Sequence, residues 1–130
     1  MTTVDRHMPV RTSPGTAAVA RDTVRELLSR QRPPVGGAAL TDALLVTSEL
    51  TTNALRHAGG ITVFGSAVRE NGLEITVEDA SDHLPTARPP SDPSMPGGHG
   101  WPMVRSLASE VTVTALPGGG KRVRALVPLR

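Results

Sequence analysis

Hydrophobic residues recur at helical spacing in two segments of the first half of the chain. Over residues 16–30 the apolar positions repeat every three or four residues until a Gln-Arg-Pro-Pro stop, which predicts a helix. A second helix is predicted to open at Thr41-Asp42, a favourable cap followed by an acid, and to run to about Ala58, where two glycines end it. Residues 1–15 lack this pattern, so we expect an irregular arm or an edge strand there.

The pattern then changes to an alternation of apolar and polar residues, which is typical of half-buried strands. The strands predicted over Ile61–Arg69 and Leu73–Asp79 are joined by an Asn-Gly pair, the strongest short hairpin signal in the chain. A second hairpin is predicted over residues 111–127, with its turn at three consecutive glycines.

A long segment rich in proline separates the two hairpins. Residues 80–100 hold five prolines and three glycines, which exclude a hidden helix, so we expect a functional lid there. A short helix is predicted over Pro102–Ser109, because proline suits a first helical position. This order of elements predicts an α+β fold, a two-layer sandwich in which helices cover one face of a mixed, largely antiparallel sheet. With 130 residues in all, we expect a single domain over residues 16–130.

The composition excludes several classes of protein. Apolar residues make up 38 % of the chain and, with 13 glycines, reach the range of about 45–50 % typical of globular domains. There is no cysteine, no apolar run long enough for a membrane span and no visible signal peptide, so we expect a cytoplasmic protein. The net charge of +2 is spread over interleaved acids and arginines, and Phe64 and Trp101 are the only aromatic residues. We therefore expect no direct binding of nucleic acid.

Polar residues form one stripe along the second predicted helix, which is otherwise largely apolar. Glu49, Asn53 and His57 are spaced by four residues, and Arg56 lies beside them. Such a stripe faces either solvent or a shared polar site. Asparagine is a poor helix former with no obvious reason to stand in mid-helix, which favours the site. The Asn53 carbonyl oxygen suits magnesium, and Glu49 could accept a proton from an attacking hydroxyl.

A carboxylate closes the apolar row of the first hairpin. Strand alternation puts Asp79 on the same face as Leu73, Ile75 and Val77, where a buried acid should meet a hydrogen-bond donor. Asp79 is either a turn cap ahead of Ser81 or the floor of a pocket that accepts a hydrogen bond from an amine, such as that of adenine. Guanine presents an acceptor at that position and would be rejected.

Glycines directly precede the short helix. The backbone N–H groups of Gly98, His99 and Gly100 are either exposed to an anion or part of a simple connector. Competing motifs fail: the Gly-Lys pair at Lys121 is followed by Arg122, not by the Ser or Thr of a P-loop. The histidines have no metal-ligand spacing.

These three places occur together and in order. The chain resembles the ATPase superfamily of gyrase, heat-shock chaperones, histidine kinases and mismatch-repair proteins, which share the Bergerat ATP-binding fold. It is most similar to the stand-alone anti-sigma-factor serine kinases. The resemblance runs from about Thr16 to Leu129 and rests on four boxes: Glu49–His57, Asp79, Gly98–Gly100 and the terminal hairpin, Gly118–Pro128.

The resemblance implies a role for each box. Asn53 would bind the Mg²⁺ that bridges the phosphates of ATP, and Glu49 would act as base or orienter for the attacking hydroxyl. Asp79 would hold the adenine amine. The backbone at Gly98–Gly100 would wrap the phosphates beneath the lid. The remaining candidate nucleotide-binding residues are Arg56, His57 and His99, which belong to the same boxes, and Ser81, which stands two residues after Asp79.

The resemblance also implies partners. In such kinases the acceptor is a serine of an anti-anti-sigma protein, and the same surface region holds a sigma factor. Relatives often form homodimers, although no decisive apolar stripe for one is visible here. The leading hypothesis is an ATP-dependent regulatory kinase. A protein-binding module that has lost phosphoryl transfer is the second, and a catalytic fragment of a histidine kinase, for which no phosphoacceptor helix is visible, is the third.

Three departures from the family pattern limit the resemblance, and those at Ser81 and Arg122 motivate the second hypothesis. Ser81 stands where the family usually has the glycine of Asp-x-Gly, and Arg122 stands where a threonine commonly supports the adenine-binding aspartate. His99 and Trp101 occupy positions at the end of the lid where arginine and leucine are frequent. We expect Trp101 to pack against the domain and not to stack on a ligand.

Overall fold

The computed structural model describes residues 16–57, 60–81 and 100–130. The arm predicted over residues 1–15 and most of the predicted lid lie outside these ranges. Within them, three helices and four strands follow one another in the order α1 (Thr16–Ser29), α2 (Gly37–His57), β1 (Ile61–Arg69), β2 (Gly72–Asp79), α3 (Gly100–Leu107), β3 (Glu110–Ala115) and β4 (Lys121–Val127).

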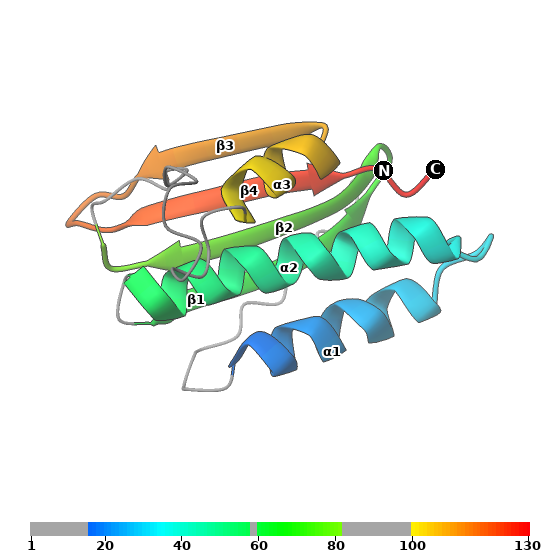
Figure 1. The fold of residues 1–130 in the computed structure, drawn as a ribbon, viewed down its shortest axis with the longest axis horizontal. Helices are drawn as coiled ribbons and strands as arrows, with labels where there is room; N and C mark the ends of the chain where they lie inside the picture. The colour runs from blue at the N-terminus through cyan, green and yellow to red at the C-terminus, as the bar shows by residue number, and fades with distance from the viewer. Residues whose placement is uncertain (1–15, 58–59, 82–99) are drawn as a thin grey trace, which may run out of the picture.

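The four strands form one open sheet in the order β1-β2-β4-β3, and each neighbouring pair is antiparallel. The three helices cover one face of this sheet (Figure 1). Apolar side chains fill the space between the two layers, with Phe64, Ile75 and Val46 among the fully buried ones. The predicted α+β sandwich is therefore confirmed. Among the described helices, none has the length and apolar character needed to cross a membrane.

Two helices begin earlier than the sequence predicts. α2 starts at Gly37 and not at Thr41, and the N–H of Leu40 already donates to the carbonyl of Gly36 at 3.0 Å. Leu40 packs against the core, so tertiary contact extends the helix through a glycine-rich segment that propensity alone disfavours. α3 starts at Gly100 and ends at Leu107, which places Pro102 in its first turn, where a missing N–H is tolerated.

β2 carries the buried row that leads to the candidate site. Leu73, Ile75 and Val77 face the helices with no more than 1 % of their surface exposed, and Asp79 closes the row at the end of the strand. The register of β2 with β4 places Asp79 opposite Lys121. At the left-hand end of Figure 1, the end of β2 therefore lies beside the start of β4, near the C-terminal part of α2.

Candidate functional site

The polar stripe on α2 borders the buried face of the helix. Glu49 and Asn53 are half-buried and Arg56 is exposed, while the side chain of His57 lies outside the described atoms. The helix also buries two threonines, Thr47 and Thr51, but their hydroxyls donate to the carbonyls of residues 43 and 47 at 2.7 Å. The threonines are satisfied within the helix. Glu49 and Asn53 lie at the edge of the core and are half-buried, where a ligand could reach them.

Glu49 meets the start of α3. A Cβ added to Gly100, the first residue of α3, would overlap the Oε1 atom of Glu49, so only glycine leaves room for the carboxylate there. The N-terminus of a helix carries partial positive charge, which favours a carboxylate beside it. The structure thus brings together two places that lie some fifty residues apart in the sequence, the polar stripe of α2 and the glycine at the start of α3.

Asp79 is paired with a lysine. The ammonium of Lys121 donates to Asp79 Oδ1 at 2.9 Å, and the two side chains are 8 % and 4 % exposed. The backbone N–H of Ser81 donates to the same oxygen, also at 2.9 Å. The expected donor for the buried acid is present, and the contact with Ser81 shows that Asp79 also caps the turn after β2.

Lys121, and not Arg122, is the residue of β4 that contacts Asp79. Arg122 donates through Nε to Glu78 Oε2 at 2.8 Å, on the sheet face away from the helices, so Arg122 does not contact Asp79. Lys121 fits no phosphate-binding loop, so no motif in the sequence singles it out. Its spacing of two from Val123, a core residue, is the sequence signal that it faces the helices.

Gly120 allows the two strands to meet at this point. Its φ of +88° is rarely adopted by residues with a side chain, and a Cβ there would overlap the carbonyl oxygen of Asp79. The glycine turn of the second hairpin thus brings the backbone of β4 against the backbone of Asp79.

Of the remaining residues singled out in the sequence, some are described by the structure and others are not. Ser81 is half-buried, and Gly98 and His99 lie outside the described residues. Trp101 is half-buried and packs against the hydrophobic core, which confirms the expectation that it packs. No group of three or more His, Cys, Asp or Glu residues that could hold a metal ion occurs in the described part of the chain.

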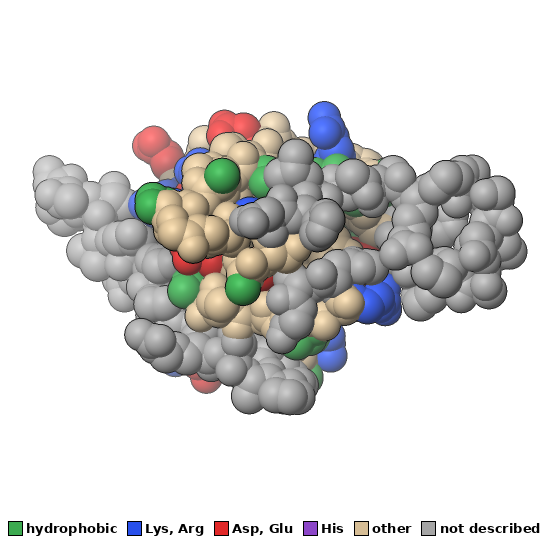
Figure 2. All heavy atoms as spheres, turned by 90° about the vertical axis from the view of Figure 1, so that its left-hand side faces the viewer, with side chains coloured by type: hydrophobic (Ala, Val, Ile, Leu, Met, Phe, Trp, Pro, Cys, Tyr) green, Lys and Arg blue, Asp and Glu red, His purple; other side chains and the backbone are tan. Residues whose placement is uncertain are grey.

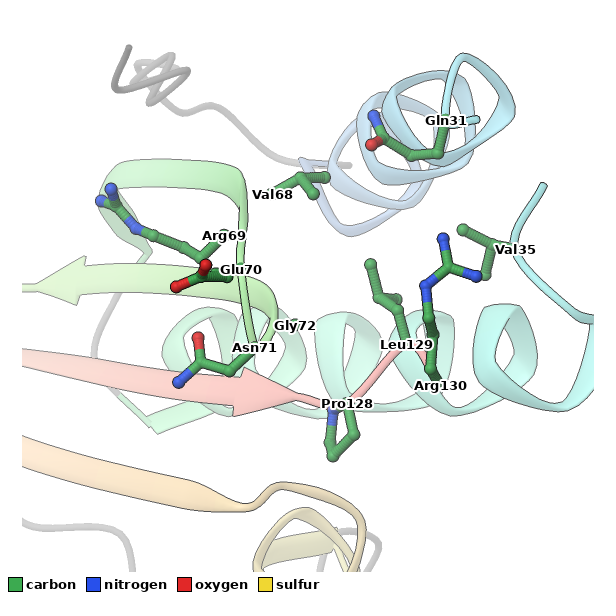
Figure 3. A pocket seen from close by; sticks show the side chains of 10 residues that line it. All are labelled: Gln31, Val35, Val68, Arg69, Glu70, Asn71, Gly72, Pro128, Leu129 and Arg130. Atoms are coloured by element: carbon green, nitrogen blue, oxygen red, sulfur yellow. The ribbon is translucent and has the colours of Figure 1, made fainter. Parts of the chain in front are cut away.

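The candidate site is distinct from a cavity at the opposite end of the molecule. Figure 2 looks onto the end of the molecule where β2 ends, and shows acidic side-chain atoms among hydrophobic side chains and the tan atoms of other side chains and the backbone near the centre of that face. The cavity, of about 330 Å³, lies instead between the α1–α2 connection, the β1–β2 turn and residues 128–130 (Figure 3). None of the predicted site residues lines it.

Residues 10–126 match the family model of the histidine kinase-like ATPase domain. The chain belongs to this family. Membership points to ATP binding and to a regulatory, kinase-like function for this histidine kinase-like ATPase domain.

Two solved structures are similar to this histidine kinase-like ATPase domain. The blue-light activated histidine kinase of Erythrobacter litoralis EL346 is 25 % identical with a TM-score of 0.54, over 86 % of this chain and 40 % of that one. The histidine kinase domain of the same protein is 23 % identical with a TM-score of 0.51, over 87 % and 59 % respectively. This chain therefore spans less than two thirds of either, and the second likeness supports the fold alone. Comparison with curated proteins gives no match.

Proposed function

We propose that this protein is an ATP- and Mg²⁺-binding regulatory kinase that holds a sigma factor and phosphorylates a serine of an anti-anti-sigma partner. The observation that carries the proposal is the contact between Glu49 and Gly100, which joins the polar stripe of α2 to the glycine box in a histidine kinase-like ATPase domain. The proposal includes a single domain over residues 16–130.

The residues present suit magnesium bound together with a nucleotide. Asn53 supplies a hard amide oxygen, and the described residues contain no acidic or histidine cluster that would hold a cation by itself. Magnesium in such sites commonly takes few protein ligands and shares the phosphate oxygens of the substrate. Bound there, the ion would neutralise charge on the phosphates.

The other side chains have separate tasks in this proposal. Glu49 orients the acceptor hydroxyl and takes its proton, at the positive end of α3. Asp79 receives the base of the nucleotide, and the backbone at Gly98–Gly100 lies along the phosphates, near Arg56 and the two histidines of the boxes. Positioning and charge stabilisation supply most of the catalysis of phosphoryl transfer, so this small set of groups suffices.

Substitution of Asn53 tests the nucleotide site. We expect Asn53→Ala to abolish Mg²⁺-dependent ATP binding in calorimetry, because the amide oxygen is lost, and Glu49→Gln to bind ATP but not to transfer phosphate. Asn71→Ala is the matched control, since Asn71 is an exposed residue of the β1–β2 turn at the other end of the sheet. An unchanged ATP affinity in Asn53→Ala would refute the assignment.

A protein-binding module without phosphoryl transfer is the second candidate. It is favoured by the carboxylate of Asp79, which is already engaged by Lys121 and Ser81. Capture of partners from the native cell, with and without ATP and Mg²⁺, followed by incubation with labelled ATP, separates the two candidates. We expect label on a serine of a captured partner, whereas a stable complex that takes up no label would favour the module.

A further inference from the structure

We infer that Asp79 and Lys121 act together as an acceptor–donor pair that recognises the edge of a purine, so that the base pocket takes 6-oxopurines as well as adenine. The inference rests on the proposed nucleotide binding and deepens it, because it assigns a selectivity to the same site. Recognition by the Asp79 carboxylate alone would reject guanine. Recognition by the pair uses two adjacent groups of opposite hydrogen-bonding character, an acceptor and a donor.

The side chains of Asp79 and Lys121 lie on the same face of the sheet. Asp79 follows the buried row of β2, and Lys121 precedes the core residues of β4, so both side chains lie on the helix-covered side of the sheet. They stand at the end where the chain leaves β2 and enters β4 (Figure 1). A ligand bound at this end would therefore meet the two groups together.

The pair keeps hydrogen-bonding capacity on both sides. Both hydrogen bonds to Asp79 end on Oδ1, and within the described residues none ends on Oδ2. Lys121 donates one of its three N–H groups, and Asp79 is its single acceptor in the described part of the chain. No fully buried side-chain oxygen or nitrogen described here lacks a partner, so Oδ2 of Asp79, which accepts no hydrogen bond from the described residues, is not sealed inside the protein.

A ligand should meet this pair intact. Displacing the ammonium from Asp79 would leave a buried charge without its partner, which is strongly unfavourable. The groups offered to the ligand are therefore one carboxylate oxygen and, beside it, the N–H groups of an ammonium.

The carboxylate oxygen alone accepts from the 6-amino group of adenine, whereas the edge of a 6-oxopurine needs both groups of the pair. Adenine presents an N–H donor at position 6 and an acceptor at N1, whereas guanine and hypoxanthine present an acceptor at position 6 and an N–H donor at N1. A carboxylate alone leaves the 6-oxo group facing another acceptor. The ammonium of Lys121 supplies the missing donor, while Oδ2 of Asp79 accepts from N1–H.

The unaltered protein provides the first test. ATP, GTP and ITP are titrated in the presence of Mg²⁺, and ITP separates the 6-oxo edge from the bulk of the 2-amino group of guanine. We expect ITP to bind within about tenfold of ATP, whereas a site that rejects a mismatched polar edge discriminates by about 10⁴-fold. Binding of ATP more than about a hundredfold tighter than ITP would overturn this inference and leave the proposed function standing. If no nucleotide binds, the proposed function fails and the inference with it.

Variants of Lys121 provide the second test. We expect Lys121→Met to weaken ITP about tenfold more than ATP, since one unpaired polar group is left against the 6-oxo edge. Lys121→Gln, which keeps an N–H donor, should restore ITP binding. Arg122→Met is the matched control, because Arg122 lies on the other face of β4 and should leave the ratio unchanged.

The variant series also has a clear negative result. An ITP-to-ATP ratio that is the same in wild type and in both Lys121 variants would refute a role for Lys121. Circular dichroism reports whether Lys121→Met is folded, and if it is not, the wild-type titration and Lys121→Gln decide the question.

Discussion

Glu74 and Asp79 are buried acids on opposite faces of β2, and each depends on different partners. Asp79 faces the helices and is held by one lysine and one backbone N–H. Glu74 faces away from the helices, is 6 % exposed, and accepts hydrogen bonds from Arg69 and Arg124. The arginines are themselves partly exposed, so water can reach them if Glu74 is lost. The buried acid of the candidate site and the buried acid on the other face of the sheet are thus supported differently.

Burial by itself would raise the pKa of Glu74, but the hydrogen bonds from Arg124 and Arg69, together with their charges, hold that pKa below its ordinary value. A carboxyl with a lowered pKa in the folded state contributes stability above its unfolded pKa, and this contribution is lost as the pH falls through the folded pKa. We therefore expect Glu74→Gln to lower the free energy of unfolding at pH 7 by about 1–2 kcal/mol.

The difference between Glu74→Gln and wild type should shrink as the pH falls below the ordinary glutamate pKa and through the lowered pKa of Glu74 in the folded state, where the carboxyl of the wild type also becomes neutral. Urea unfolding at pH 7 and at pH 3 measures both values. Glu70→Gln, at an exposed position of the β1–β2 turn, serves as the control. An equal loss of stability at the two pH values would contradict the assigned role of the ion pairs.

At the contact between α2 and α3, the start of one helix determines where a side chain of the other can lie. α3 supplies a glycine and a helix N-terminus, and α2 supplies the carboxylate that lies against them. The obstacle to a side chain at position 100 is the far end of a flexible glutamate, which can turn away at little cost. This position therefore affects the placement of Glu49 more than the stability of the fold.

Gly100→Ala should consequently separate function from stability. We expect the free energy of unfolding to change by less than about 1 kcal/mol, because alanine is a good helix former, while phosphoryl transfer falls about tenfold or more as Glu49 is displaced. Chemical unfolding and transfer of labelled phosphate to the partner measure the two effects.

Two comparisons make this result specific. Gly37→Ala, at the start of α2 with no atom near an added Cβ, should leave both quantities unchanged. In a Glu49→Ala background, Gly100→Ala should have no further effect on transfer. Full transfer by the single variant Gly100→Ala would show that the position of the carboxylate is unimportant.

For the whole molecule, local signals predicted the elements and long-range pairing determined the site. The Asn-Gly hairpin and the alternation that ends at Asp79 were legible because neighbouring residues specify them. The start of α2 at Gly37 could not be predicted from the sequence, since packing of Leu40 overrides the preference of glycine for turns. The partnership of Asp79 and Lys121 depends on β2 lying beside β4, which no local pattern contains.

The strand order also has a consequence for synthesis of the protein. β4 lies between β2 and β3, although it is the last of the four described strands along the sequence. A nascent chain that has left the ribosome only as far as β3 can close the β1–β2 hairpin, but it has no central strand to join β2 to β3. The apolar row of β2 therefore lacks its second neighbour until β4 emerges from the exit tunnel, and during that interval a chaperone would find its binding surface there.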